Sequence, residues 1–282
     1  MKAPARLVAV MVVLAMTTIV LAPLQLLAMR ILPRRAGLLP MVWQRIAAAM
    51  IGMRVTVEGS PANGSAPLLL VANHVSWLDI VTLGRVLPVS FIAKREVSGW
   101  PVVRRLARLQ QTVFIDRTRR AATTSASAEI AERLSAGDTL VLFAEGTTGD
   151  GISVLPFRSA LVGAAARAAG PGGSITVQPV AIVYTALHGL PIGRLRMAEI
   201  AWHGDMDLAP HLSGLVATGA IDAVVAFGMP RTVDAGADRK QVTADAERAV
   251  RAMVRRIRAA RGRPATAAKD EDGAIFSGAE SG

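Results

Sequence analysis

The chain has 282 residues, of which 52% are hydrophobic and 4% aromatic, and its formal net charge at pH 7 is +11. This length accommodates one sizeable α/β domain with accessory segments. The positive charge suits an anionic partner such as a phospholipid surface, an acidic carrier protein or nucleic acid, although arginine on solvated faces gives the same balance. The absence of cysteine excludes disulfides, thiolate nucleophiles and cysteine-ligated zinc.

A long apolar segment lies at the N-terminus. No residue in 7–29 is charged, and a helix rising about 1.5 Å per residue over this run spans the roughly 30 Å hydrocarbon core of a membrane. A signal peptide fits less well because no small-x-small cleavage site follows, and a buried soluble helix is rarely apolar on every face. We therefore expect residues 1–53 to form a membrane helix and a second, interfacial helix over 38–53, for which a core helix is the alternative.

Strands and helices alternate along the rest of the chain. Short apolar or alternating runs predict strands at 54–58, 68–72, 89–93, 112–115, 139–143, 175–184 and 221–227. Helical patterns occupy 123–135, 159–169 and 236–261, the last of them basic and amphipathic, and 262–282 has the composition of a disordered tail. This order predicts an α/β fold in which a mixed, largely parallel sheet is flanked by helices, with the catalytic domain at 54–235.

The first of four polar clusters contains Asn73, His74, Ser76 and Asp79, directly after the strand at 68–72. Histidine is suited to take a proton near neutral pH, and a carboxylate on its other ring nitrogen fixes the tautomer. Five residues rotate by about 140° on a helix, so the two side chains meet only if His74 lies in the turn and Asp79 in the first helical turn. A capping box from Ser76 to Asp79 is the structural alternative.

The other clusters also follow strands. Residues 114–117 end in Arg117, which is suited to bind a phosphate or to form a surface ion pair. Glu145, Gly146 and Thr147 follow the strand at 139–143, and such a loop either holds an anion or is an ordinary turn. The proline in 177–180 predicts a bulge or an edge strand.

In this order and spacing the four clusters resemble the glycerolipid acyltransferase family, in particular the bacterial 1-acyl-glycerol-3-phosphate acyltransferases. The family pattern N-H-x-x-x-x-D matches at Asn73, His74 and Asp79, and the pattern F-P-E-G-T matches at Phe143, Glu145, Gly146 and Thr147. The second and fourth blocks match at 114–117 and 177–182, so the resemblance covers roughly 54–227. Two departures are Ala144, where the family usually has proline, and 109–111, where a glycine often precedes the second block.

The resemblance implies an O-acyltransferase that needs no cofactor or metal. His74 would deprotonate the acceptor hydroxyl and Asp79 would orient His74, while backbone donors near the His74 turn would stabilise the oxyanion. The alkoxide would attack the thioester of acyl-CoA or of an acyl carrier protein without a covalent enzyme intermediate. The substrate-binding residues implied are Arg117, Glu145, Gly146, Thr147, Asn73 and Lys94.

The expected acceptor is 1-acyl-glycerol-3-phosphate, which gives phosphatidic acid, and lyso-ornithine lipid is the alternative because a subgroup acylating it shares the motifs. Expected partners are membrane phospholipids, the lysolipid and the acyl donor, with no nucleic acid, at the inner cell membrane with a cytoplasmic catalytic domain. Two rivals are a serine hydrolase using Ser76, which lacks the G-x-S-x-G pattern, and a non-catalytic, membrane-anchored lipid-binding protein supported by the basic C-terminal helix.

Overall fold

The computed structural model describes residues 3–63, 67–94, 101–115, 120–160, 162, 174–234 and 236–261. The strands in these ranges are β1 (Met53–Glu58), β2 (Leu68–Ala72), β3 (Ser90–Lys94), β4 (Val113–Ile115), β5 (Leu140–Phe143), β6 (Ser174–Leu187), β7 (Leu190–Pro191), β8 (Ile221–Phe227) and β9 (Arg231–Asp234). The helices are α1 (Ala3–Ile31), η1 (Pro33–Arg35), α2 (Leu38–Ile51), α3 (Leu78–Gly84), α4 (Pro101–Leu109), α5 (Arg120–Ser135), α7 (Arg194–Met197), α8 (Leu208–Thr218) and α9 (Arg239–Arg261). The predicted tail and most of the predicted helix at 159–169 lie outside the described residues.

These strands form one sheet in the order β1-β8-β6-β2-β5-β3-β4, and β7 and β9 pair with the long strand β6. β2 runs parallel to both β5 and β6, and β3 runs parallel to both β5 and β4. β8 is antiparallel to β6 and parallel to β1. The predicted mixed, largely parallel sheet is therefore confirmed.

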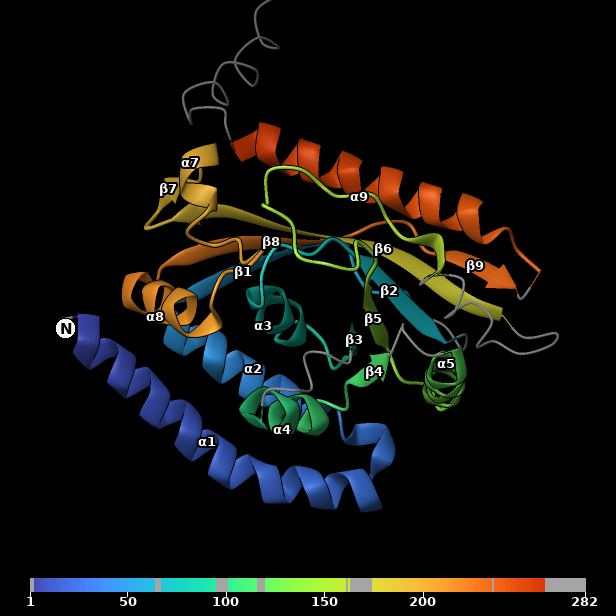
Figure 1. The fold of residues 1–282 in the computed structure, drawn as a ribbon, viewed down its shortest axis with the longest axis horizontal. Coiled ribbons are helices and arrows are strands. Elements are labelled where there is room, and N and C mark those ends of the chain that lie inside the picture. Colours follow the sequence, from blue (N-terminus) through green and yellow to red (C-terminus); the bar gives the residue numbers. More distant parts are fainter. Residues whose placement is uncertain are drawn as a thin grey trace, which may run out of the picture.

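Helices cover both faces of this sheet, with α9 on one side and α2, α3 and α8 on the other (Figure 1). Successive side chains of a strand point to opposite faces, so Leu69 and Val71 of β2 join a core with Leu134 and Val250 from α5 and α9. Leu70 instead joins a second core that contains residues of α2, α3 and α8. β2 is buried on both faces, which explains its uninterrupted apolar sequence.

The carboxyl ends of the parallel strands lie at the same edge of the sheet, where ligands of α/β folds usually bind. His74 follows β2, Glu145 follows β5, and Lys94 ends β3. The sheet topology thus gathers at one edge the polar clusters that the sequence places after separate strands.

Pro179 lies within β6, which is an interior strand, so the predicted edge position is wrong. On one side β6 pairs with β2 throughout this region, and on the other side its partner changes. Residues up to Val177 pair with β9, whereas those from Val180 onward pair with β8. The proline therefore occupies the junction between two partner strands, where a missing N–H removes no ladder hydrogen bond.

α1 runs alongside the domain rather than away from it (Figure 1). The indole of Trp43 on α2 donates to Thr18 on α1 (2.9 Å), and Gln25 on α1 donates to the carbonyl of Leu109 in α4 (2.8 Å). The segment Ala5–Ile31 is long and apolar enough to cross a membrane. α2 buries one face in the core, as the alternative of a core helix expects, and exposes Leu38 on another; its interfacial role stays a prediction.

Candidate active site

His74 and Asp79 form a hydrogen-bonded pair at the carboxyl end of β2. His74 lies in the turn that leaves β2, and Asp79 lies in the first turn of α3. This is the arrangement that their separation of five residues requires. The distance from His74 Nδ1 to Asp79 Oδ2 is 2.8 Å, and the exposed fractions of the two side chains are 18% and 0%. The carboxylate accepts the Nδ1 proton, so the Nε2 lone pair of a neutral His74 remains available for an acceptor hydroxyl.

Asp79 is held by donors on both of its carboxylate oxygens. The backbone N–H groups of Val75 and Ser76 donate to Oδ2 at 2.6 and 3.0 Å. The hydroxyl of Tyr184, on β6, donates to Oδ1 at 2.7 Å. Burial, and next the negative charge of Asp79, raise the pKa of Tyr184 well above its usual range, so the phenol remains a donor.

The predicted capping box is present only in part. Asp79 reaches back to the N–H of Ser76, as the acidic member of such a box does. The Ser76 hydroxyl is buried and has no hydrogen-bond partner among the described residues. Ser76 therefore does not cap α3 through its side chain, and the structure shows no hydrogen bond that would activate it as a nucleophile.

Glu145 fixes the backbone of the turn that carries His74. One carboxylate oxygen accepts the N–H of His74 at 2.9 Å, and the other accepts the N–H of Leu155 at 3.2 Å. Burial raises the pKa of Glu145 to about 7 against the opposing effect of these two donors. With both oxygens engaged by backbone, Glu145 lies where it positions His74 and the loop after β5, rather than where it contacts a substrate.

Asn73 continues the pairing of β2 and β6 with its side chain. Its amide nitrogen donates to the carbonyl of Ile182, and its amide oxygen accepts the N–H of Ile182, both at 2.9 Å. The side chain is buried and aligns the His74 turn with β6. This geometry supports a positioning role for Asn73, and the substrate contact that the resemblance implied stays a prediction.

The ring of His74 packs on Phe143, the last residue of β5. Their ring centroids are 3.9 Å apart and the planes differ by 10°. Phe91 also stacks on Phe143, with ring centroids 5.9 Å apart. The stack restricts rotation of the imidazole about its hydrogen bond to Asp79, which keeps the reactive nitrogen in one orientation.

The loop after β5 is held by α9. Arg258 donates to the carbonyl oxygens of Gly151 and Ile152, and Glu247 accepts the N–H of Phe157 at 2.8 Å. Gly151 has a φ of +72°, and a Cβ atom there would lie 2.8 Å from Met197. A larger residue would strain this loop against the segment that follows β7.

The structure describes three of the remaining predicted residues, Gly146, Thr147 and Lys94, but not Arg117. Gly146 is buried with a φ of +71°, so the tight turn after β5 needs a glycine, and Thr147 is exposed beside it. Lys94 is half-buried at the end of β3, on the catalytic edge. Arg117 follows β4 but lies outside the described residues. Gln111 adopts a φ of +57°, a conformation that glycine adopts readily, in the segment where the family often has a glycine.

The backbone N–H groups of the His74 turn, from which oxyanion donors were expected, already have acceptors. The N–H of His74 is taken by Glu145, and those of Val75 and Ser76 are taken by Asp79. These three N–H groups therefore position the dyad, and an oxyanion donor near this turn stays a prediction that must rest on other groups.

Sequence reasoning also missed two partners of the catalytic turn. Tyr184 was recognised only as a strand residue, because nothing local in the sequence ties it to Asp79. Trp77 donates its indole N–H to His211 on α8 at 3.0 Å, and burial lowers the pKa of His211. Neutral His211 can accept this hydrogen bond, which attaches α8 to the turn that carries His74.

The comparisons with known proteins all match acyltransferases. A family model described as Acyltransferase matches residues 54–183. The lyso-ornithine lipid O-acyltransferase of Brucella abortus is 48% identical over 88% of this chain and 92% of its own length. The chain belongs to the acyltransferase family. The lyso-ornithine lipid O-acyltransferase of Rhizobium meliloti is 42% identical over 92% of this chain and 88% of its own.

The fold of this acyltransferase is also that of a solved relative. The crystal structure of the 1-acyl-sn-glycerophosphate acyltransferase PlsC from Thermotoga maritima superposes with a TM-score of 0.63. It covers 90% of this chain and 95% of its own, at 22% identity, so the likeness establishes the architecture alone. The matched family region contains the dyad and Glu145, whereas Tyr184 follows directly after it.

Proposed function

We propose that this acyltransferase moves a fatty acyl group from acyl-CoA or an acyl carrier protein to the free hydroxyl of lyso-ornithine lipid. The observation that carries the reaction type is the dyad of His74 and Asp79, with its reactive nitrogen turned away from the carboxylate. The acceptor rests on the two relatives that match nearly the whole chain, because both are named for lyso-ornithine lipid. They favour this acceptor over 1-acyl-glycerol-3-phosphate, which the motifs alone had placed first.

The proposed reaction is a direct transfer. His74 Nε2 takes the proton of the acceptor hydroxyl as the oxygen attacks the thioester carbonyl, and Asp79 stabilises the imidazolium. The tetrahedral intermediate collapses with cleavage of the C–S bond, and the departing thiolate takes the proton from His74. The products are the acylated lipid and a free thiol, so His74 returns to its starting state.

Two cationic residues are proposed to hold the acceptor headgroup. Lys94 lies on the catalytic edge, and Arg117 follows the adjacent strand β4 in sequence. Lyso-ornithine lipid carries a carboxylate, and 1-acyl-glycerol-3-phosphate carries a phosphate, so either acceptor presents an anion to such a pair.

The proposed location is the inner cell membrane, with the catalytic domain in the cytoplasm. Supporting features are the apolar span Ala5–Ile31 and its exposed side chains, among them Val12, Ile19 and Leu27. A lysolipid acceptor resides in a membrane, whereas acyl-CoA and acyl carrier proteins are cytoplasmic donors. An enzyme anchored by α1 would meet both substrates at the membrane surface.

The test uses purified full-length protein in detergent micelles. Each acceptor, lyso-ornithine lipid or lysophosphatidic acid, is paired with each labelled donor, acyl-CoA or acyl carrier protein. We expect transfer to lyso-ornithine lipid with a kcat/KM at least about tenfold higher than that for lysophosphatidic acid. A higher kcat/KM for lysophosphatidic acid would show that 1-acyl-glycerol-3-phosphate is the preferred acceptor. Transfer to neither acceptor would refute the function.

His74→Ala and Asp79→Asn test the dyad. We expect both to reduce kcat by at least about a hundredfold, as removal of a general base or its orienting partner does. Asp245→Asn is the matched control, since Asp245 is a carboxylate of α9 that pairs with Arg231 and Arg248. Activity of His74→Ala equal to that of the control would contradict the mechanism.

A further inference from the structure

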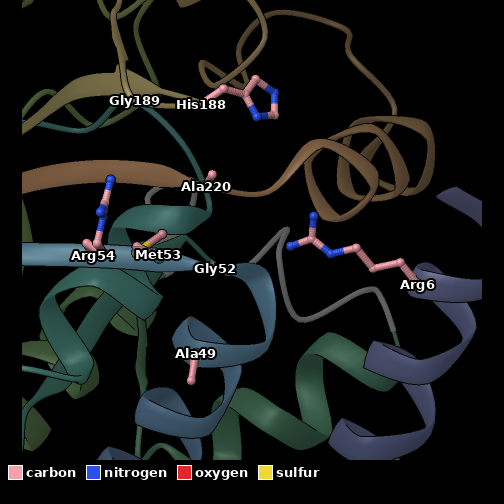
Figure 2. Close-up of a pocket in the computed structure, with 8 residues that line it drawn as sticks. All are labelled: Arg6, Ala49, Gly52, Met53, Arg54, His188, Gly189 and Ala220. Atoms are coloured by element: carbon pink, nitrogen blue, oxygen red, sulfur yellow. The ribbon is translucent and has the colours of Figure 1, made fainter. Parts of the chain in front are cut away.

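An open surface pocket of about 730 Å³ lies at the start of β1, apart from the dyad and its hydrogen-bond partners. Figure 2 shows Arg6 reaching in from α1 on one side, Arg54 on β1 at the other, and His188 above them at the end of β6. Among the described residues, those that line the pocket include no acid, and the nearest acidic partner is Asp222, which pairs with Arg54. Two arginines and a histidine thus lie along the rim of one open pocket.

The two arginines are held in different ways. Arg6 donates to the carbonyl oxygens of Ile51 and Ala217, which fixes its guanidinium at the wall. Arg54 forms a bidentate pair with Asp222 at 2.7 and 3.1 Å, but 73% of its side chain is exposed. An ion pair in water contributes little stability, so Arg54 can exchange part of this contact for an anionic ligand at small cost.

Two residues that line the pocket have unusual backbone conformations. His188 and Ala220 have φ values of +57° and +50°, a region that residues other than glycine seldom adopt. The N–H of His188 donates to the carbonyl of Ala220 at 2.8 Å, so the two residues join the end of β6 to the start of β8. Strained residues of this kind often occur where a ligand binds.

The pocket lies at the beginning of the apolar helix. Arg6 is in the first turns of α1, at the start of the segment Ala5–Ile31. The exposed side chains of Val8, Met11 and Val12 follow it directly. In a membrane-anchored chain this position is the boundary between water and hydrocarbon, where the charged headgroups of lipids lie.

We propose that this pocket binds the headgroup of an anionic phospholipid. Its phosphate contacts Arg54 and Arg6, and its acyl chains lie against the exposed side of α1. Such a lipid is a bound partner and not a substrate, because the residues that hold it are not those of the dyad. The pocket would hold this phospholipid regardless of which acceptor the enzyme acylates, so the proposal does not depend on the proposed function.

Binding of a fluorescent, short-chain phosphatidylglycerol to the full chain in neutral detergent micelles tests this site. We expect added salt to weaken binding and unlabelled phosphatidylcholine to compete poorly, since it lacks net negative charge. Arg54→Gln should weaken binding about fivefold, as expected for one basic residue at an anionic surface. Arg6→Gln combined with Arg54→Gln should weaken it further.

Arg231→Gln is the matched control, because Arg231 is another exposed strand arginine that pairs with a carboxylate, Asp245. It should leave binding within about twofold of the wild type. Arg54→Gln leaves the hydrogen bonds of Arg6 intact, so it remains informative even if the double variant unfolds. Unchanged binding in Arg54→Gln, equal weakening in Arg231→Gln, or equal competition by phosphatidylcholine would overturn the proposal.

Discussion

Asp79 is a fully buried carboxylate, and such a group is costly unless its lone pairs find donors. It receives them from the His74 ring, the N–H groups of Val75 and Ser76, and the Tyr184 hydroxyl. The turn and β6 therefore specify where the carboxylate lies before a substrate arrives. Removing one donor costs more than an average hydrogen bond, because a buried anion is left incompletely solvated.

Tyr184→Phe removes the donor to Asp79 Oδ1 and leaves the ring in place. We expect kcat to fall about tenfold while KM changes less than about twofold, because the lost bond holds the orienting carboxylate and contacts no substrate. Steady-state kinetics separate the two constants. Thr185→Val is the control, since it removes a neighbouring hydroxyl of β6 that bonds the carbonyl of Asp222. Equal losses in both variants would assign the effect to the strand instead of the dyad.

A second prediction concerns Glu145, whose pKa burial raises from 4.5 to about 7. Between these values the folded chain holds a proton that the unfolded chain has released, so the free energy of unfolding falls as pH rises. We expect the Tm of the wild type to fall between about pH 5 and about pH 8 more steeply than that of Glu145→Gln, which cannot ionise. Thermal unfolding in detergent measures both slopes, and equal slopes would disprove the assignment.

The sequence predicts the dyad but not its full support. His74 and Asp79 are near enough in the chain for a turn followed by a helix to bring them together. Tyr184 is 105 positions from Asp79, and its contact depends on the register in which β6 pairs with β2. Asn73 and Glu145 were identified by motif, yet their backbone partners, Ile182 and Leu155, could be found only from the structure.

At the scale of elements, α9 acts on the catalytic edge through the loop that follows β5. Its apolar side packs on the sheet, with Val242, Ala246 and Val250 in the core. Its polar side supplies Glu247 and Arg258 to the backbone of the loop. The same loop supplies the Leu155 N–H that binds Glu145, so α9 influences the dyad without touching it.

Glu247→Ala tests this connection. It leaves the N–H of Phe157 without its acceptor, and we expect stability to fall by about 1–2 kcal/mol and hydrogen exchange in residues 150–158 to accelerate. Asp245→Ala, two residues earlier on α9, removes exposed ion pairs and should cost less than about 1 kcal/mol. Exchange in the loop that is the same for both variants would rule out the connection.

The sequence predicts buried strands better than it predicts short or irregular elements. β2 and β5 are uninterrupted apolar runs and were located within one residue. α8 and β9 were missed: Pro210 and Gly214 interrupt the helical pattern of α8, and only Val233 of the four residues of β9 is buried. β9 forms because β6 extends beyond its pairing with β8, a property of the whole sheet.

At the scale of the whole molecule, the apolar helix α1 is attached to the domain by hydrogen bonds along its length. Arg6, Thr18 and Gln25 fasten it to α2, α4 and α8, while its opposite side exposes apolar side chains. Membrane attachment through α1 would therefore hold the catalytic edge at a defined orientation relative to the lipid.

Val20→Asp tests the attachment. Val20 is exposed near the middle of the apolar span, where aspartate opposes membrane insertion by about 2.5–3.5 kcal/mol. We expect a smaller fraction of the chain to remain in membranes after alkaline carbonate washing. Val57→Asp is the control, because Val57 is an exposed apolar residue of β1 outside α1. Retention of both variants at the wild-type level would exclude α1 as the attachment.

The pairing of β1 with β8 has a consequence for biosynthesis. Arg54 and Asp222, which are partners in this ladder, are 168 positions apart in the chain. At about 5–20 residues per second, a ribosome needs roughly ten to thirty seconds to make the intervening segment. During that time α1 and β1 have already emerged, and the edge of β1 has no partner strand. Until β8 is made, this edge is open to wrong strand pairing, and we expect early membrane contact of α1 to help keep the chain from aggregating.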